Sequence, residues 1–485
     1  MHFSSLQNFQ NFLTQTKLVE PPQLQECMAR LQSRGQGIDN LLSELEQRHL
    51  LTPYQLAKLR KRETDGLVLG KLKLLYRNAS GSFARVFRGC STEDGRMLGV
   101  KVLRTRWAED PRKVQLFKRE GELGKRLKHK NIVPIYEVGS EGNQHFLTME
   151  FVEGGNFREL MKARGKFPAL EATRYAQDIA EGLEYALSLG LTHRDMKLTN
   201  VLLSAQGVAK LVDFGLAGQD SNANSIDEEV DRAVEYAALE RGSGAPENDP
   251  RSDLYFLGAI FYELLTGAPP YAPSKNKHER RQFSRYRDVR PIREIDPSLP
   301  LNVTRIVDDL VCVNPNERYQ TPTTVLRDLR AVLGAQASSN STSAEPAAPP
   351  KPALPTILCV EERLGQQDAL RQYFTKHGYR VLMLSSFERA LPRLQSDAPK
   401  GLVVMGNVLG NDVESSYESA SAACRDSGTS MVFVLSKHQR EFKDRLANSG
   451  VSRVLYEHPV TLRNIRKALE DLWKNPSLAQ DHPVS

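Results

Sequence analysis

The hydrophobic pattern divides the chain into three blocks with different periodicities. Residues 1–66 place apolar residues at helical spacing, and Thr52-Pro53 has the form of an N-cap followed by a proline in the first turn. Residues 67–335 begin with strand-like runs and become helix-rich. Residues 356–475 alternate short apolar runs, such as TILCV and GLVVM, with amphipathic stretches. That rhythm predicts a parallel α/β sheet with helices between its strands.

Two segments lack a pattern of this kind. Residues 336–355, QASSNSTSAEPAAPPKPALP, are rich in Ser, Ala and Pro, a composition that favours a semi-rigid, disordered linker. Residues 476–485 form a short tail. We therefore expect a multidomain α+β protein with a small N-terminal helical domain, a central domain and a C-terminal doubly wound α/β domain.

Composition narrows the class of protein further. A chain of 485 residues is too long for one ordinary core, and 40% hydrophobic with 26% charged residues is typical of a soluble globular protein. The net charge of +7 is spread along the chain, so it does not indicate a nucleic-acid or membrane partner. The five cysteines show no C-x-x-C spacing, which disfavours a zinc site or a disulfide framework.

The N-terminus lacks a signal-peptide pattern, and the longest apolar stretch, residues 254–265, is too short to cross a bilayer. We expect a cytoplasmic protein.

One lysine of the central block lies inside a strand-like apolar run. Lys101 occupies the middle of GVKVL. Burying an ammonium group without a partner is unfavourable, so its side chain should meet a carboxylate or a phosphate. Glu120, in FKREGELGKRLKH on a predicted helix, is a suitable partner.

Further polar residues follow in two short motifs. THRDMKLTN supplies Asp195, Lys197 and Asn200 on one loop, and KLVDFGLA ends a strand with Asp213. In this order and at these intervals, the motifs resemble the catalytic domain of protein kinases, specifically the eukaryotic-like (Hanks-type) Ser/Thr kinases of bacteria. The resemblance covers about residues 70–333. It implies a bilobal kinase fold, ATP and Mg²⁺ as cofactors, and protein Ser/Thr hydroxyls as substrates.

The resemblance also implies a role for each of these residues. Asp195 would accept the proton of the substrate hydroxyl, and Lys197 would neutralise the γ-phosphate. Asn200 and Asp213 would hold Mg²⁺ through oxygen ligands. The implied nucleotide-binding residues are Ala79, Gly81, Phe83, Val86, Lys101, Glu120, Glu150, Val152 and Leu202.

Several of these nucleotide-binding residues have a specific implied contact. Lys101 would pair with the α- and β-phosphates while Glu120 holds it in place. Phe83 would cap the phosphates and Val86 would pack on adenine. Backbone groups of Glu150 and Val152, which follow Met149, would hydrogen-bond the adenine edge.

The sequence departs from the family pattern around the nucleotide loop, NASGSFARVFRG. A loop of the form G-x-G-x-x-G would have three glycines where this chain has Ala79, Gly81 and Ala84. Alanine restricts the backbone and its approach to phosphate, so we expect slower or weaker nucleotide handling. Gly99 replaces an alanine that packs on adenine, and Ala233 replaces a threonine that hydrogen-bonds the catalytic aspartate and lysine. Since every charged catalytic position is kept, an active kinase is favoured over a nucleotide-binding pseudokinase scaffold.

The end of the activation segment contains a misleading motif. Residues 245–247 spell the A-P-E that closes this segment in the family, but they lie too close to Asp253. Glu240 in EYAALE has the expected spacing, and we expect it to form a buried ion pair with Arg318. Residues 245–247 are then interpreted as a loop.

Two neighbouring segments carry further hypotheses. A phosphate on Ser221 or Ser225 could pair with Arg194, or the acidic residues 227–229 could supply a constant negative charge instead. The basic insert 274–290 is interpreted as a solvated loop, with docking of an acidic substrate as the alternative.

The C-terminal α/β block resembles the receiver domain of response regulators. Glu361-Glu362 matches the acidic pair of that family, and Ser436 follows the fourth strand. Gly406 stands where the phosphoacceptor aspartate should be, and His458 replaces the lysine. The resemblance therefore implies a degenerate receiver-like domain used for docking or dimerisation; an unrelated doubly wound domain and a live phosphoacceptor domain are the alternatives.

Overall fold

The computed structural model describes all residues except 1, 2, 4, 32–36, 49, 205, 215–233, 272, 273, 275, 340–354, 385, 386, 388, 389, 392, 393, 395–397, 410, 411, 447, 457–459 and 475–485. The hypotheses on residues 221, 225, 227–229, 233 and 458, on the tail and on most of the linker lie outside the described residues. The chain forms two compact units, one of residues 68–347 and the other of residues 1–67 and 348–485. No helix among the described residues is both long and apolar enough to span a membrane.

The described residues of the N-terminal helical domain form four short helices. Their buried side chains include Phe9, Leu13, Leu41 and Leu45, which recur at helical spacing. Thr52 accepts a hydrogen bond from the Gln55 amide and the Gln55 side chain accepts one from the Thr52 amide, so the predicted N-cap forms a capping box. The helices are α1 (Leu6–Gln15), α2 (Pro21–Leu31), α3 (Ile38–Gln47) and α4 (Pro53–Arg60).

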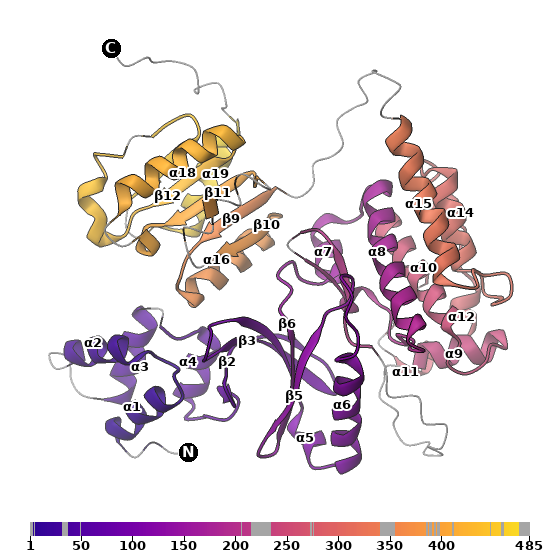
Figure 1. The fold of residues 1–485 in the computed structure, drawn as a ribbon, viewed down its shortest axis with the longest axis horizontal. Helices are drawn as coiled ribbons and strands as arrows, with labels where there is room; N and C mark the ends of the chain where they lie inside the picture. Colours follow the sequence, from indigo (N-terminus) through magenta and orange to yellow (C-terminus); the bar gives the residue numbers. More distant parts are fainter. Residues whose placement is uncertain are drawn as a thin grey trace. The chain divides into compact units, whose positions relative to one another are not determined.

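The second unit begins with an antiparallel sheet in the order β1-β2-β3-β4-β6-β5 (Figure 1). Val86 is directly opposite both Ala79 and Lys101 in this sheet. Directly opposite residues of antiparallel strands project from the same face, so these three side chains share one face. The strands are β1 (Val68–Leu69), β2 (Leu72–Ser80), β3 (Ala84–Ser91), β4 (Met97–Leu103), β5 (Ile135–Glu141) and β6 (Gln144–Glu150), accompanied by α5 (Thr105–Ala108) and α6 (Pro111–Gly124).

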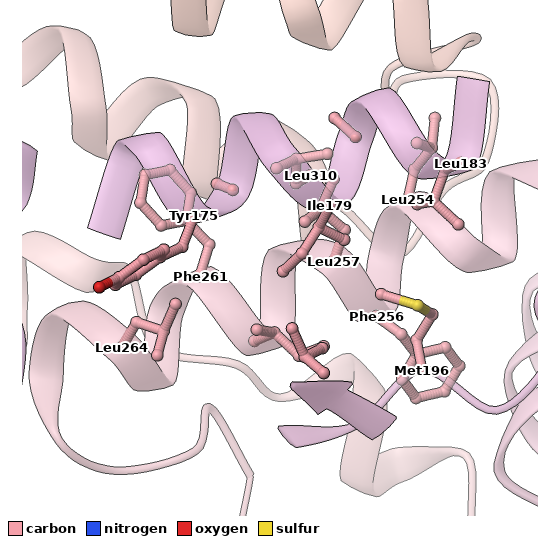
Figure 2. Close-up of a cluster of buried hydrophobic side chains, with 14 of the residues drawn as sticks. Tyr175, Ile179, Leu183, Met196, Leu254, Phe256, Leu257, Phe261, Leu264 and Leu310 are labelled. Atoms are coloured by element: carbon pink, nitrogen blue, oxygen red, sulfur yellow. The ribbon is translucent and has the colours of Figure 1, made fainter. Parts of the chain in front are cut away.

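A helical lobe follows the sheet and is built around α10 (Pro250–Thr266). All residues from 252 to 265 are buried, which explains the longest apolar run of the sequence. Figure 2 shows α10 side chains such as Leu257 and Phe261 packing with Ile179 of α8 and Leu310 of α14. Asp249 caps α10 and Pro250 occupies its first turn.

The other elements of the helical lobe surround α10. They are α7 (Phe157–Arg164), α8 (Ala169–Ser188), η1 (Leu198–Asn200), β7 (Val201–Leu203), β8 (Ala209–Leu211), α9 (Val234–Ser243), α11 (Lys277–Arg280), α12 (Ser284–Arg287), α13 (Ile292–Ile295), α14 (Leu301–Leu310) and α15 (Pro322–Ser339). Helix α15 continues four residues beyond position 335, through residues 336–339. The basic insert 274–290, which was expected to be a solvated loop, contains the two short helices α11 and α12.

The C-terminal domain contains the predicted parallel sheet, in the order β10-β9-β11-β12-β13. Residues 357–360 and 402–405 are buried, as expected for strands covered on both faces. The strands are β9 (Thr356–Val360), β10 (Arg380–Leu384), β11 (Gly401–Met405), β12 (Ser430–Val434) and β13 (Ser452–Leu455), with α16 (Leu364–Lys376), η3 (Gly406–Leu409), α18 (Val413–Ser427), η4 (Lys437–Phe442) and α19 (Leu462–Lys474) between or after them.

Candidate active site

Lys101 on β4 lies between two carboxylates. Its Nζ is 2.7 Å from Glu120 Oε1 on α6 and 2.7 Å from Asp213 Oδ1 after β8. Lys101 is only 2% exposed, and a buried ammonium group needs such partners to remain charged. The predicted Lys101–Glu120 pair is formed, and Asp213, 112 residues further along the chain, joins it.

Asp195 is the centre of a second polar cluster. Lys197 Nζ lies 2.9 and 2.8 Å from its two carboxylate oxygens. The side-chain amide of Asn200 donates to the Asp195 carbonyl at 2.9 Å and to its carboxylate at 2.8 Å. Because the nitrogen of Asn200 is used in this way, its carbonyl oxygen is the atom that can face a cation.

The loop that carries Asp195 is held in place by hydrogen bonds to α10. Asp253 accepts hydrogen bonds from the backbone amides of His193 at 2.7 Å and Arg194 at 3.0 Å. Two charge-assisted bonds to backbone amides are strong and directional. The position of Asp253 in the first turn of α10 thus sets the position of the loop that carries Asp195.

His193 connects the two polar clusters. Its Nδ1 accepts from the Asp195 amide at 3.2 Å, and its Nε2 lies 3.2 Å from the carbonyl of Val212, the residue before Asp213. This arrangement requires the neutral tautomer with the proton on Nε2. Burial lowers the pKa of His193 to about 4, so the ring remains neutral at physiological pH.

An apolar pocket adjoins Lys101, Glu120 and Asp213. Its wall includes Met149, and Gly99 on the neighbouring strand makes room for that side chain. A Cβ at position 99 would lie 2.9 Å from Met149 Cγ and 3.3 Å from the Glu150 carbonyl oxygen. The remaining lining residues are Gly124, Leu127, Ile132, Val133, Ile135, Leu147, Leu211, Val212 and Phe214.

The other implied nucleotide-binding residues surround the same region. Val152 is buried in the hydrophobic cluster that contains Met149, and Leu202 packs against that cluster. The Glu150 carboxylate accepts from Lys210 Nζ at 2.6 Å, and its amide donates to the Pro134 carbonyl at 3.1 Å. That amide is therefore already hydrogen-bonded within the chain.

The Phe83 side chain, which the resemblance places above the phosphates, is buried in this structure. It is 4% exposed and lies in the hydrophobic cluster of the strand-rich lobe, with its ring centroid 6.2 Å from that of Phe117. Burying an aromatic ring removes a large apolar area from water. The Gly81 amide closes the loop by donating to the Ala84 carbonyl at 3.0 Å.

The prediction of an ion pair between Glu240 and Arg318 is wrong. The guanidinium of Arg318 donates to the carbonyls of Cys312, Val313 and Arg251 and lies over the Tyr255 ring. Glu240 accepts from Ser252 Oγ at 3.0 Å and from the Asn248 amide at 3.3 Å.

The separation of Glu240 from Arg318 has a structural reason. Leu239 replaces the family's proline, so α9 runs as one helix from Val234 and directs Glu240 to Ser252. Residues 245–247 lie between α9 and α10, outside both helices, as the sequence spacing indicated.

Sequence reasoning missed other residues that shape this site. Tyr236 and His193 tie the catalytic loop to its neighbours, although neither had been assigned a role. Gly121 and Gly124 bring α6 close to β5: a Cβ at these positions would lie 2.6 Å from Val138 Cγ2 and 2.5 Å from Ile135 Cδ1, respectively. Two glycines within a predicted helix were the available signal, because glycine there is unfavourable without a packing reason.

The two-lobed fold and this constellation of Lys, Glu and Asp define a protein kinase. The family model described as the protein kinase domain matches residues 79–328, just over half of the chain. The chain therefore belongs to the protein kinase family.

Its curated relatives carry the more specific name of serine/threonine-protein kinase. The chain is 32% identical over 254 residues to a probable serine/threonine-protein kinase of Clostridium acetobutylicum, covering 52% of this chain and 38% of that protein. It is 31% identical over 247 residues to the serine/threonine-protein kinase PknB of Mycobacterium leprae, covering 50% of this chain and 39% of that protein. It is 32% identical over 257 residues to the serine/threonine-protein kinase PknL of Mycobacterium tuberculosis, covering 52% of this chain and 63% of that protein. The chain thus spans less than two thirds of the length of these relatives.

Proposed function

We propose that this chain transfers the γ-phosphate of Mg-ATP to Ser or Thr hydroxyls of protein substrates. The observation that carries the proposal is the contact of Lys101 with both Glu120 and Asp213, beside a loop that presents Asp195 and Asn200. Phosphoryl transfer mainly requires that the protein neutralise the triphosphate and align the attacking hydroxyl. These residues supply a cation for the phosphates and an acceptor for the proton.

The residues fit a magnesium site of the type that nucleotides complete. Mg²⁺ prefers oxygen ligands and usually takes one or two from the protein. Asn200 Oδ1 and the Asp213 carboxylate would be these ligands, since the Asn200 side-chain nitrogen is already bonded to Asp195. When bound, the ion neutralises charge on the phosphates.

Each charged side chain then has one task in the transfer. The substrate oxygen forms a bond to the γ-phosphorus, the bond from that phosphorus to the β-phosphate oxygen breaks, and the hydroxyl proton passes to Asp195. Lys197 pairs with Asp195 in this structure and would turn to the γ-phosphate when nucleotide is bound. Lys101, held by Glu120, would contact the α- and β-phosphates.

The decisive experiment compares the wild-type chain with Asp195→Asn in Mg-ATP autophosphorylation and transfer to a generic protein substrate. Loss of the proton acceptor should lower the rate by roughly 10²–10⁴-fold. Asp309→Asn on α14 makes the same chemical change away from the site and should leave the rate unchanged. Equal rates for wild type and Asp195→Asn would contradict the proposal. If wild type transfers no phosphate but ATP raises its Tm, the pseudokinase scaffold is the correct function.

We also propose that the C-terminal domain is a receiver-like module for docking or self-association that accepts no phosphate. Glu361 is fully buried and is held by Arg363 and Asn407, with Arg363 Nη2 2.8 Å from Glu361 Oε2. A side chain at Gly406 would collide with Gln439 Oε1 and lie 2.9 Å from the Val434 carbonyl oxygen. This crowding supports a site in which a phosphoacceptor has no room.

The test of this second proposal uses Gly406→Asp in the full chain. We expect the variant to unfold at a lower temperature and to take up no phosphoryl group from acetyl phosphate and Mg²⁺. A stable variant that becomes acid-labile phosphorylated would contradict the closed site. Sedimentation over a range of concentrations tests self-association of the wild type.

A further inference from the structure

Unusual contacts surround the nucleotide loop on the side of α5. The Ser82 carbonyl accepts two hydrogen bonds from side chains of that helix, from Arg106 Nη2 at 2.6 Å and from the indole Nε1 of Trp107 at 3.1 Å. Arg104, the residue before α5, donates from Nη2 to Ser80 Oγ at 2.8 Å. Each of these donors lies more than 20 residues along the chain from its acceptor.

The backbone of the loop is held at the same place. The Arg104 amide donates to the Phe83 carbonyl at 3.0 Å, and the Gly81 amide donates to the Ala84 carbonyl at 3.0 Å. Two further kinds of contact hold residues 80–84 in place. The Phe83 ring is buried near Phe117 of α6, and side chains of α5 donate hydrogen bonds to the Ser82 carbonyl.

Two of these donors, Arg104 and Arg106, belong to a group of closely spaced arginines. Burial and the positive charges of Arg85, Arg106 and Arg77 all lower the pKa of Arg104. Such crowding opposes folding unless other contacts offset it. The bonds to Ser80 and Ser82 are contacts of that kind, and they tie the group to the loop.

The helix that supplies the donors is itself anchored. Trp107 packs against the hydrophobic cluster of the strand-rich lobe, and Arg106 and Lys113 lie over its ring at 5.0 and 5.7 Å from the centroid. Asp110 then caps α6 by accepting from the amides of Arg112 and Lys113. The loop is thus connected to the same helix that presents Glu120 to Lys101.

We propose that Arg106 and Trp107 are positioning residues that hold the nucleotide loop in its phosphate-binding position, replacing the adaptability that glycine would give at positions 79 and 84. This inference rests on the proposed function, since it concerns nucleotide binding. A loop with alanine at both positions has fewer backbone conformations with which to close on a nucleotide. Holding it in one conformation before binding removes part of the ordering cost of the complex.

The experiment measures the loop directly, without catalysis. Hydrogen exchange of the peptide that contains the Gly81 and Ala84 amides is followed in the full chain for wild type and for Arg106→Ala/Trp107→Phe. Exchange in the loop should become several-fold faster, while exchange in α10 stays unchanged. Binding of a non-hydrolysable ATP analogue, measured by calorimetry, should weaken by about three- to tenfold, because two solvent-exposed hydrogen bonds are lost. Arg112→Ala removes a nearby exposed positive charge that has no contact with the loop and is the matched control.

The outcomes separate this inference from the proposed function. Unchanged loop exchange and unchanged analogue binding in the double variant would overturn the positioning role, whether or not the chain transfers phosphate. If exchange also rises in α10, the single variant Trp107→Phe decides, because it keeps an aromatic ring at this position and removes the indole N–H. Restoration of slow loop exchange by Arg106→Lys, which keeps a donor, would support the assignment. A wild type that transfers no phosphate would refute the proposed function but leave the exchange result standing.

Discussion

Tyr236 and Asp253 are joined by a buried hydrogen bond of 2.9 Å from the phenol to the carboxylate. The same phenol oxygen accepts from the Met196 amide at 3.1 Å, so helix α9, helix α10 and the catalytic loop meet at one atom. Burial, followed by the nearby Asp253 charge, raises the pKa of Tyr236 well above its usual value. The phenol therefore remains a donor throughout the working pH range.

Tyr236→Phe should lower the free energy of unfolding by about 1–3 kcal/mol, because Asp253 loses a donor and the Met196 amide is left without an acceptor in a buried place. Urea denaturation measures the change. Tyr319→Phe removes a phenol that donates to the partly exposed Asp328 and should have a smaller effect. Equal losses in the two variants would contradict the central role of Tyr236.

Glu240 and Arg318 should show no energetic coupling. A double-mutant cycle with Glu240→Gln and Arg318→Lys tests this, since residues that share no contact have additive effects within about 0.5 kcal/mol. Arg318→Lys alone should be the more harmful change, because the guanidinium serves three backbone carbonyls. Burial lowers the pKa of Arg318 to about 10, so the group is charged at neutral pH. A coupling energy above about 1 kcal/mol would restore the ion pair that the sequence suggested.

His193 should make the protein less stable in mild acid. Its pKa is about 4 in the folded chain and about 6.5 when unfolded, so the unfolded state binds the extra proton first. Stability is complete above pH 6.5 and falls as the pH drops toward 4, by roughly 3 kcal/mol in total from this group.

Chemical unfolding at several pH values tests this prediction. The difference in unfolding free energy between wild type and His193→Gln should shrink between pH 7 and 4, because only the wild type loses the contribution of this ring. A difference that is constant over that range would show that His193 does not titrate on unfolding.

Gly121 should control the Lys101–Glu120 contact through the packing of α6 on β5. A methyl group at position 121 would press on Val138, a β-branched side chain with little rotamer freedom. We expect Gly121→Ala to lower the rate of phosphoryl transfer by at least about tenfold, because a misplacement of about 1 Å in such a site is that costly. Adding Val138→Ala should restore activity by giving the methyl group room.

Gly124→Ala is the matched control for that experiment. It introduces the same atom one turn later, at the edge of the apolar pocket, where it meets Ile135 Cδ1 at 2.5 Å and Ile135 Cγ1 at 3.5 Å, the end of a flexible side chain. Its effect on activity should be smaller. If Val138→Ala does not restore the activity of Gly121→Ala, the packing of α6 on β5 is not the cause of the lost activity.

The sequence predicted best where the chemistry itself demands a residue. A lysine in an apolar strand required a carboxylate, and Glu120 is that carboxylate. The alternation of apolar runs in residues 356–475 predicted the parallel sheet that the structure contains.

The failures arose where tertiary packing decides between local alternatives. Nothing in the sequence says that the Phe83 ring packs near Phe117. The replacement of the family's proline by Leu239 lets α9 continue as one helix and turns Glu240 away from Arg318. The contacts of Arg106 and Trp107 with Ser82 link distant residues through side chains, and no local pattern marks them.

The salt bridge of Arg363 with Glu361 has a consequence for how the C-terminal domain responds to its surroundings. A guanidinium that is part of the chain cannot be diluted, chelated or exchanged. The acidic pair at the end of β9 therefore carries its own permanent counter-ion. If the proposed magnesium site is correct, EDTA should remove the ion from the nucleotide site and leave the melting of the C-terminal domain unchanged.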